Sequence, residues 1–418
     1  MRKTIGNPFN FIDLKVLMLS FLNKHKSVLS FSFLKFIEIA FTSFTTLYIG
    51  SILEPEEMSK VVPCLLYISY SSFLALGINQ VLVKNYGENR IRLNSIMKSN
   101  FFFTLFVSIV SLLVSLFIFD VSIGLFIGLI SFIELWRSYF MAIFRVKDRI
   151  LILNKNNLIF AITFLTGTLI YVKSIENYLF IWAISLILSV LFYTYDGRNY
   201  LKEIFQLDVK LMRVFKINLL EGIQLSLLGI STTILLTMDR FVFNFLIDNK
   251  EVLGTYQMAD FFGKGFYLVL TTVIFYFYPL IIRRLKDSIE FLKRYKKGLK
   301  RAFILLPLFL LVSYIFIEVL TIYIYKEYKN LPLFVTLNIL IKFSVLMLSL
   351  VSTIYVAKNN EKIYLKIIFP VILLIFTILM LYGYFIGLKF IITLPIFLSL
   401  SSLVVGLKLL TNTKINDN

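Results

Sequence analysis

The sequence is poor in the residues that most metal sites and catalytic centres use. Among its 418 residues there is one cysteine, Cys64, and one histidine, His25. A single cysteine excludes an intramolecular disulfide and a cysteine-ligated metal cluster, and the lone histidine lies in the polar N-terminal segment. The chain has no glycine-rich phosphate loop, which argues against ATP hydrolysis. We therefore predict no metal, no cofactor and no catalytic residue, and we expect that the protein is not an enzyme.

Charge is scarce as well, since only 16% of the residues are charged whereas 59% are apolar. A soluble protein carries roughly 25% charged and 45–50% apolar residues. The apolar residues fall in runs of about twenty, the length that a helix needs to cross roughly 30 Å of hydrocarbon. The 44 Phe and 23 Tyr residues suit a lipid-facing surface with aromatic anchors at its edges. The composition predicts an all-α integral membrane protein.

The runs predict about twelve transmembrane helices, arranged as two six-helix lobes around a central cavity. The expected spans are 27–52, 61–83, 99–119, 121–144, 152–172, 177–195, 217–247, 254–281, 302–325, 331–356, 365–386 and 390–407. Very tight connections at Asp120 and around 387–389 predict antiparallel hairpins. Because 196–216 is one of the two longest connections and divides the spans equally, we take it as the linker between the lobes.

This division gives five segments. They are a cytoplasmic N-terminal segment 1–26, an N-lobe 27–195, a cytoplasmic linker 196–216, a C-lobe 217–407 and a cytoplasmic tail 408–418. The segment 1–26 has acidic Asp13 and no small-residue cleavage site, so it is not a signal peptide. Its apolar residues predict either a helix on the membrane surface or a simple tether.

The net charge of +19 follows from topology rather than from a nucleic-acid partner. Lysine and arginine occupy alternate connections, with the densest group in 283–301, while the opposite connections hold few basic residues. This asymmetry places both termini in the cytoplasm. Every connection is too short to hold a soluble catalytic domain.

Several charged residues lie inside the predicted spans, where a charge at the bilayer centre costs about 2.5–3.5 kcal/mol. They should therefore face water or one another. The basic ones are Lys35, Arg137, Arg240, Lys264 and Lys342. The acidic ones are Glu38, Glu134, Glu221, Asp239, Asp260 and Glu318.

Spacing places three pairs on shared helix faces: Lys35 with Glu38, Glu134 with Arg137, and Asp260 with Lys264. Such pairs either make insertion tolerable or line a substrate path, and the sequence leaves both interpretations open. Two cations, Arg240 and Lys342, lack a partner on the same face of their own helix. We place Lys342 near mid-membrane and Arg240 and Asp260 closer to the outside.

A cavity with excess positive charge between low-dielectric walls would attract an anion. Phosphate or diphosphate groups fit best, because Arg binds them bidentately and Lys binds them as a point charge. Two glycines, Gly124 and Gly128, share a helix face and predict close helix packing. The prolines Pro279, Pro307, Pro370 and Pro395 are expected to bend their helices.

Two stretches resemble a known family. Residues 46–84 read TLYIGSILEPEEMSKVVPCLLYISYSSFLALGINQVLVK, and residues 237–260 read TMDRFVFNFLIDNKEVLGTYQMAD. The first resembles the opening hairpin of Wzx-type polysaccharide (O-antigen) lipid flippases, and the second resembles their segment at spans seven and eight. These flippases belong to the multidrug/oligosaccharidyl-lipid/polysaccharide exporter superfamily. The chain departs from the family pattern at Met58-Ser59 and at Gln257.

The resemblance implies movement of an undecaprenyl-diphosphate-linked oligosaccharide from the inner to the outer leaflet of the bacterial plasma membrane, by alternating access. It implies polysaccharide or lipopolysaccharide biosynthesis, with polysaccharide polymerase and chain-length proteins as further partners and no nucleic acid. The cations Lys35, Arg137, Arg240, Lys264 and Lys342 would attract the diphosphate. The acids Glu38, Glu134, Asp239 and Asp260 would orient these cations or exchange protons.

Three alternatives remain. A multidrug or cation antiporter would share the architecture but would need an acidic, aromatic-lined site, whereas the mid-membrane residues Lys35, Arg137 and Lys342 outnumber Glu38 and Glu134. A membrane-embedded polymerase or glycosyltransferase would need larger external loops. A scaffold would not need charges inside its spans.

Overall fold

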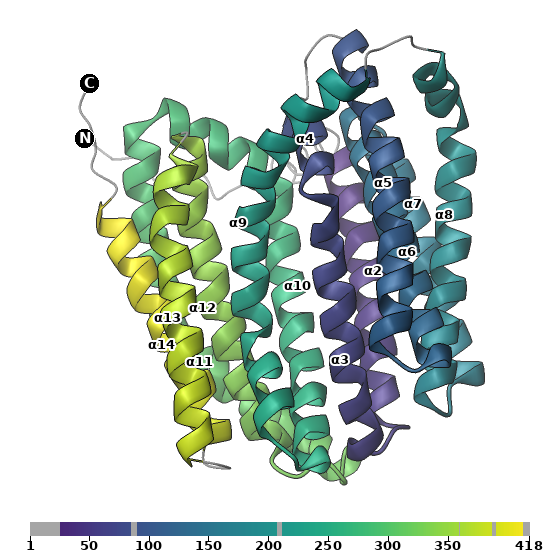
Figure 1. Ribbon diagram of the computed structural model, residues 1–418. Coiled ribbons are helices and arrows are strands. Elements are labelled where there is room, and N and C mark those ends of the chain that lie inside the picture. Colours follow the sequence, from purple (N-terminus) through teal and green to yellow (C-terminus); the bar gives the residue numbers. More distant parts are fainter. Residues whose placement is uncertain (1–25, 85–89, 207–210, 359, 387–389, 413–418) are drawn as a thin grey trace, which may run out of the picture.

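The computed structural model describes residues 26–84, 90–206, 211–358, 360–386 and 390–412. Over these residues the chain is helical and contains no strand. Eleven helices in the described part are long and apolar enough to cross a membrane, and α10 (Lys250–Asp287) runs beside them as a further long helix (Figure 1). The fold class expected from the sequence is therefore confirmed. The N-terminal segment and the 387–389 turn lie outside the described residues, except for Lys26.

The helices form two lobes, which Figure 1 shows side by side. The N-lobe comprises α2 (Lys26–Gly50), α3 (Pro55–Ser71), η1 (Ser72–Ala75), α4 (Ile78–Lys84), α5 (Arg90–Ile118), α6 (Val121–Val146), α7 (Ile150–Tyr171) and α8 (Ile175–Phe205). The C-lobe comprises α9 (Leu211–Leu246), α10, α11 (Ile289–Tyr323), α12 (Leu331–Ala357), α13 (Glu361–Ile386) and α14 (Phe390–Asn412). Within them α5 packs on α6, α2 on α7, and α10 and α14 on α12.

The second predicted span, 61–83, is not one helix. It begins earlier, because Pro55 lies in the first turn of α3, where its fixed φ suits a helix start. It breaks at Leu76 and Gly77, whose φ values of 47° and 69° are left-handed. A Cβ on Gly77 would lie 3.0 Å from the carbonyl carbon of Gly222 on α9. Gly77 therefore permits both the turn and the close approach of the two lobes.

The two long connections expected from the sequence are largely helical. Helix α8 continues to Phe205 before α9 begins at Leu211, and only Ser288 separates α10 from α11. The Ser288 hydroxyl accepts a hydrogen bond of 3.1 Å from the Phe291 amide and caps α11. Hydropathy marked the ends of the apolar runs, but the Lys, Glu and Arg residues beyond them are good helix formers. The helices therefore continue past the apolar runs.

The hairpin predicted at Asp120 is confirmed, since α5 ends at Ile118 and α6 begins at Val121. The close packing predicted for Gly124 and Gly128 is also confirmed. A Cβ on Gly124 would lie 2.9 Å from the Ser115 carbonyl oxygen, and one on Gly128 would lie 3.1 Å from the Leu112 Cα. The Ser115 hydroxyl donates a 2.8 Å hydrogen bond to the Gly124 carbonyl and further joins the two helices.

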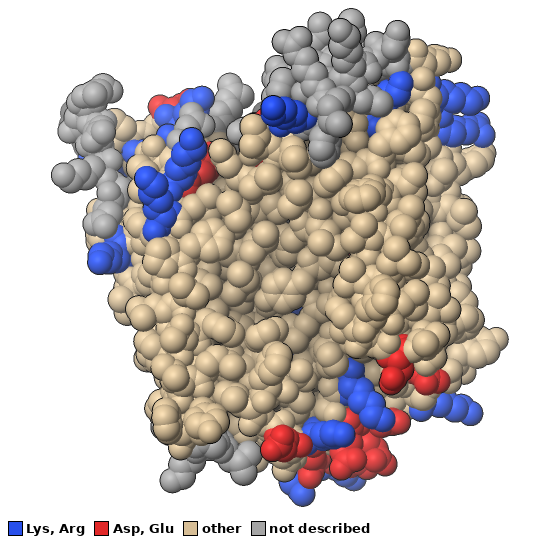
Figure 2. All heavy atoms as spheres, in the orientation of Figure 1, with Lys and Arg blue, Asp and Glu red and all other residues tan. Residues whose placement is uncertain are grey.

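Charged side chains gather at the two ends of the bundle, with an uncharged band between them (Figure 2). We call these ends the basic end and the acidic end. The basic end holds the C-terminal ends of α6, α8 and α12, with Arg145, Lys202 and Lys358. The acidic end holds the turns that precede α3 and α10, with Glu54, Asp248 and, in the first turns, Glu56, Glu57 and Glu251. The band is as expected for a chain that crosses hydrocarbon.

Candidate functional site

In the C-lobe, one carboxylate joins three helices. The Asp260 carboxylate on α10 lies 2.9 Å from the Arg240 guanidinium on α9 and 2.6 Å from the Lys342 ammonium on α12. All three side chains are buried. The contacts are ion pairs by distance but lack hydrogen-bond geometry at the carboxylate. The Lys342 ammonium also donates a 2.9 Å hydrogen bond to the Leu236 carbonyl.

This arrangement corrects two expectations. Asp260 was expected to pair with Lys264, four residues along its own helix, but its ion-pair partners come from α9 and α12. It was also placed at a different depth from Lys342. Because α10 begins at Lys250 rather than 254, Asp260 lies about 15 Å along its helix and Lys342 about 16 Å along α12. The two charges are therefore level, and Arg240 and Lys342 find their acidic partner on α10 rather than on their own helices.

A second buried acid lies beside the first. The Tyr256 hydroxyl donates a 2.6 Å hydrogen bond to the Asp239 carboxylate, and both side chains are buried. Asp239 and Arg240 are neighbours in sequence and were expected to point to different faces, yet each contacts a side chain of α10. The hydroxyls of Tyr70 on α3 and Thr237 on α9 lie 2.7 Å apart and connect this region to the N-lobe.

In the N-lobe, both local pairs predicted from spacing are present. The Lys35 ammonium lies 2.6 Å from the Glu38 carboxylate, and the Arg137 guanidinium lies 3.0 Å from that of Glu134. Arg137 is buried and lies over the Phe160 ring, 4.7 Å from its centroid. This stacking is favourable for a guanidinium in a dry environment. In each pair, the basic and the acidic side chain belong to the same helix and neutralise each other, as the ion-pair interpretation requires.

Two residues of this cluster were not predicted from the sequence. The Asn157 side-chain oxygen on α7 accepts hydrogen bonds from Arg137, at 3.0 and 3.3 Å, and from the Tyr193 hydroxyl on α8, at 2.8 Å. Asn and Tyr are common in membrane helices and carry no formal charge, so the positions of charged residues in the sequence do not single them out. The run Asn154, Asn156 and Asn157, all buried, was the available signal.

Lys264 connects the two lobes electrostatically. It interacts with Asp260, Arg240 and Lys342 in its own lobe and with Glu134 of the N-lobe. Its side chain forms no ion pair with a described residue, and it is exposed although it belongs to the middle part of α10. A residue that is surrounded by protein and close to charges of both lobes, and whose side chain is nevertheless exposed, lies on an internal surface between the lobes. Lys264 is therefore the one predicted cation of the described site that is both accessible and free of an ion pair.

The lobes are fastened to each other at the acidic end. The Tyr328 hydroxyl, between α11 and α12, donates a 2.6 Å hydrogen bond to the Leu53 carbonyl, and that of Tyr325 donates a 3.1 Å bond to the Leu47 carbonyl. We call these two bonds the tyrosine latch. Nearby, Gly254 of α10 packs so closely on α3 that a Cβ there would lie 3.1 Å from the Pro55 Cα.

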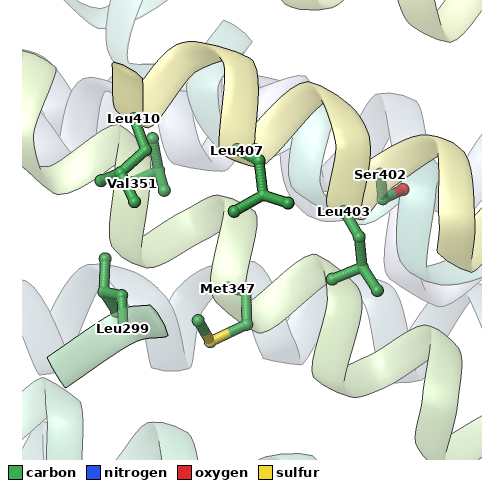
Figure 3. Close-up of a pocket in the computed structure, with 8 residues that line it drawn as sticks. Leu299, Met347, Val351, Ser402, Leu403, Leu407 and Leu410 are labelled. Atoms are coloured by element: carbon green, nitrogen blue, oxygen red, sulfur yellow. The ribbon is translucent and has the colours of Figure 1, made fainter. Parts of the chain in front are cut away.

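Two cavities of the described part of the chain lie away from these charged clusters. A gap of about 10 Å³ between α11, α12 and α14 is lined by apolar side chains such as Leu299, Met347 and Leu407, together with Ser402 (Figure 3). A groove of about 350 Å³ between α13 and α14 is lined by uncharged residues, among them Tyr382 and Phe397. Neither touches the charged clusters. Among the described residues there is also no group of three or more His, Cys, Asp or Glu side chains that could hold a metal.

Comparisons with known proteins identify solved structures of similar fold, but they identify no family by sequence. No family model and no curated protein matches the sequence. Among solved structures, a multidrug resistance MATE family transporter of the MOP superfamily in an inward-facing conformation is similar, with a TM-score of 0.68 at 12% identity, covering 93% of this chain and 100% of that one. A Vibrio cholerae MATE transporter, VcmN, has a TM-score of 0.61 at 13% identity over 92% of this chain and 94% of its own.

A MATE family transporter in an outward-facing conformation has a TM-score of 0.55 at 14% identity, covering 93% of this chain and 97% of that one. The chain thus has the two-lobed fold of these transporters. These neighbours are transporters rather than enzymes, which agrees with the expectation from composition. Two of these similar structures are described as members of the MOP superfamily, to which the sequence resemblance also pointed, but as its MATE family transporters and not as Wzx flippases.

Proposed function

We propose that this protein is an alternating-access transporter that moves an anionic, lipid-linked oligosaccharide across a bacterial plasma membrane. The carrier would be undecaprenyl diphosphate, and the basic end would face the cytoplasm, following the bias of Lys and Arg. The single observation that carries the proposal is the position of Lys264. Its side chain is exposed, lies near charges of both lobes and has no ion-pair partner among the described residues.

The other charges of the site support an anion as the substrate. Each acidic side chain there already has a partner: Asp260 contacts two cations, Asp239 accepts from Tyr256, and Glu38 and Glu134 pair on their own helices. A cationic substrate would have to displace one of these partners. An anion would instead find Lys264 available, and the diphosphate is the part of the proposed substrate with that charge.

The residues divide into two roles under this proposal. Lys264 would contact the diphosphate, with Lys35 and Arg137 raising the positive potential on the N-lobe side. Asp260 would hold Arg240 and Lys342 in place and so position the helices that carry the site. The polymerase and chain-length proteins implied by the sequence resemblance would act on the product in the outer leaflet.

The structural comparisons favour a second candidate, a multidrug or cation antiporter. The similar structures are described as multidrug resistance MATE family transporters, and the same two lobes would serve that function. For such an antiporter, Asp239 or Asp260 would have to exchange its present partner for a cation or a proton. This candidate predicts that a carboxylate, and not Lys264, is the residue most sensitive to substitution.

One experiment tests both candidates. The protein is reconstituted in liposomes, and translocation of a fluorescent polyprenyl-diphosphate oligosaccharide is followed by a membrane-impermeant quencher, beside uptake of a fluorescent cation. We expect Lys264→Gln to abolish oligosaccharide translocation, while the exposed control Lys297→Gln leaves it unchanged. Cation uptake that survives Lys264→Gln but is lost in Asp239→Asn, with no oligosaccharide translocation in the wild type, would establish the antiporter instead.

A further inference from the structure

The first turns of α11 form a basic segment outside the membrane span. The apolar stretch of this helix begins after Arg301, so residues 289–301 precede it. One side of this segment packs on the bundle through Leu292 and Leu299, which are buried. The other side presents the basic residues Lys293, Arg294, Lys296, Lys297, Lys300 and Arg301. The segment is therefore amphipathic, and its apolar side faces the protein.

Side-chain contacts hold this segment against the last two turns of α12. The Tyr295 hydroxyl donates a 3.1 Å hydrogen bond to the Leu350 carbonyl of α12. Leu299 points toward Val351 of α12 and Leu410 of α14 (Figure 3). Because α12 is apolar up to Ala357 and is followed by Lys358, the end of α12 marks the boundary between hydrocarbon and headgroups.

Three lysines converge at this boundary. Lys296 and Lys300 are one helical turn apart on the same face of α11, and Lys358 follows the last turn of α12. Partial burial and the charges of Lys358 and Lys300 lower the pKa of Lys296. The acid of this segment, Glu290, pairs with Arg294 at 2.5 Å. The packing of α11 on α12 thus places the three lysines in one region, where the charges of Lys300 and Lys358 act on Lys296.

We propose that Lys296, Lys300 and Lys358 bind the phosphate of an anionic membrane lipid at the basic end of the C-lobe. A phosphate there would offset the mutual repulsion of the three ammonium groups. A lipid fits better than a soluble anion, because the site lies at the hydrocarbon boundary and α11 continues below it with strongly exposed apolar side chains, such as Ile304 and Leu308. These would contact the acyl chains. The inference is independent of the substrate that the protein transports.

The test is lipid binding by the full-length protein, measured by native mass spectrometry in detergent with added phosphatidylglycerol or phosphatidylcholine. The variant Lys296→Gln/Lys300→Gln/Lys358→Gln removes the site. The control Lys286→Gln/Lys293→Gln/Lys297→Gln removes the same charge from exposed positions. One basic residue near an anionic surface accounts for about a five-fold change in affinity, which corresponds to about 1 kcal/mol.

We expect the site variant to lose phosphatidylglycerol affinity more than ten-fold and the control to stay within about two-fold. Equal losses in both variants would show general surface attraction and overturn the site. Binding of phosphatidylcholine as tight as that of phosphatidylglycerol would also overturn the site. Displacement of phosphatidylglycerol by millimolar inorganic phosphate would overturn the lipid assignment, because it would indicate a soluble-anion site. If the triple variant does not fold, Lys296→Gln is compared with Lys297→Gln, with about a five-fold loss expected for the first and less than about two-fold for the second; equal losses would overturn the site.

Discussion

Asp260 of α10 and Lys342 of α12 form a buried ion pair, with 2.6 Å between the carboxylate oxygen and the ammonium nitrogen. Arg240 of α9 completes the group at 2.9 Å. A buried carboxylate shared by two cations leaves one net positive charge, and the carboxyl group of Asp239 lies beside this group. This group therefore joins three helices of the C-lobe, and it leaves Lys264 as the accessible charge.

Replacement of Asp260 is expected to destabilise the C-lobe strongly. Asp260→Asn leaves Arg240 and Lys342 buried without their counter-charge, and breaking a buried pair from one side costs about 3–5 kcal/mol. The midpoint of thermal unfolding in detergent should fall clearly, whereas it should not change for the exposed control Glu290→Gln. Adding Lys342→Met to Asp260→Asn should restore part of the loss. A double variant whose loss equals the sum of the two single losses would contradict this coupling.

The tyrosine latch is expected to favour closure of the acidic end. Tyr328→Phe removes a buried cross-lobe hydrogen bond to the Leu53 carbonyl, which contributes about 0.5–1.5 kcal/mol. The equilibrium should shift up to about ten-fold toward states open at that end. Distances measured between spin labels on α3 and α10 would report the shift. The exposed Tyr323→Phe is the control, and an identical distance distribution in both variants would be inconsistent with a latch.

The latch should be insensitive to pH over the physiological range. Burial raises the pKa of Tyr325 to about 12, above the value near 10 of an unfolded tyrosine. A raised folded-state pKa gives a stabilising contribution that is complete below pH 10 and is lost as the pH rises through about 12. The same label distances should therefore stay constant from pH 5 to 9. A change in the label distances between pH 5 and 9 that disappears in Tyr325→Phe would contradict the raised pKa of Tyr325.

Added volume at Gly254 should act against closure. A Cβ at this position would lie 2.5 Å from the Pro55 carbonyl carbon on α3, a distance that packed atoms do not reach. Gly254→Ala should therefore separate α10 from α3 and increase the population open at the acidic end. Gly298→Ala is the matched control, because its Cβ would meet nothing within 4 Å. If Gly254→Ala, expressed at the same level as the wild type, leaves the population open at the acidic end unchanged, the close contact between Gly254 and Pro55 is contradicted.

Much of the fold could be predicted from hydropathy, because hydrocarbon thickness sets the length of an apolar run. The long helices, the Asp120 hairpin and the packing at Gly124 were all predicted correctly. The break at Leu76 and Gly77 was not, since φ depends on the approach of α9 as well as on local sequence. The helical extensions around Ser288 were missed because charged helix formers resemble a loop in a hydropathy profile.

The candidate site was predictable within one helix but not between helices. The pairs of Lys35 with Glu38 and of Glu134 with Arg137 follow from helical spacing. The partners of Asp260 are 20 residues earlier and 82 residues later in the chain, so only the packing of α9, α10 and α12 reveals them. Asn157 and Tyr193 escaped notice because uncharged polar side chains do not distinguish a site from an ordinary helix contact.

The order of these partners along the chain has a consequence for biogenesis. A ribosome adds about 5–20 residues per second, so Lys342 is made roughly 4–16 s after Asp260, which it follows by 82 residues. During that interval Arg240, already synthesised on the preceding helix, is the available counter-ion. We expect α9 and α10 to leave the translocon together as a charge-balanced hairpin. Premature termination before α12 would then leave Asp260 with one of its two cations, a state that a membrane quality-control protease is suited to recognise.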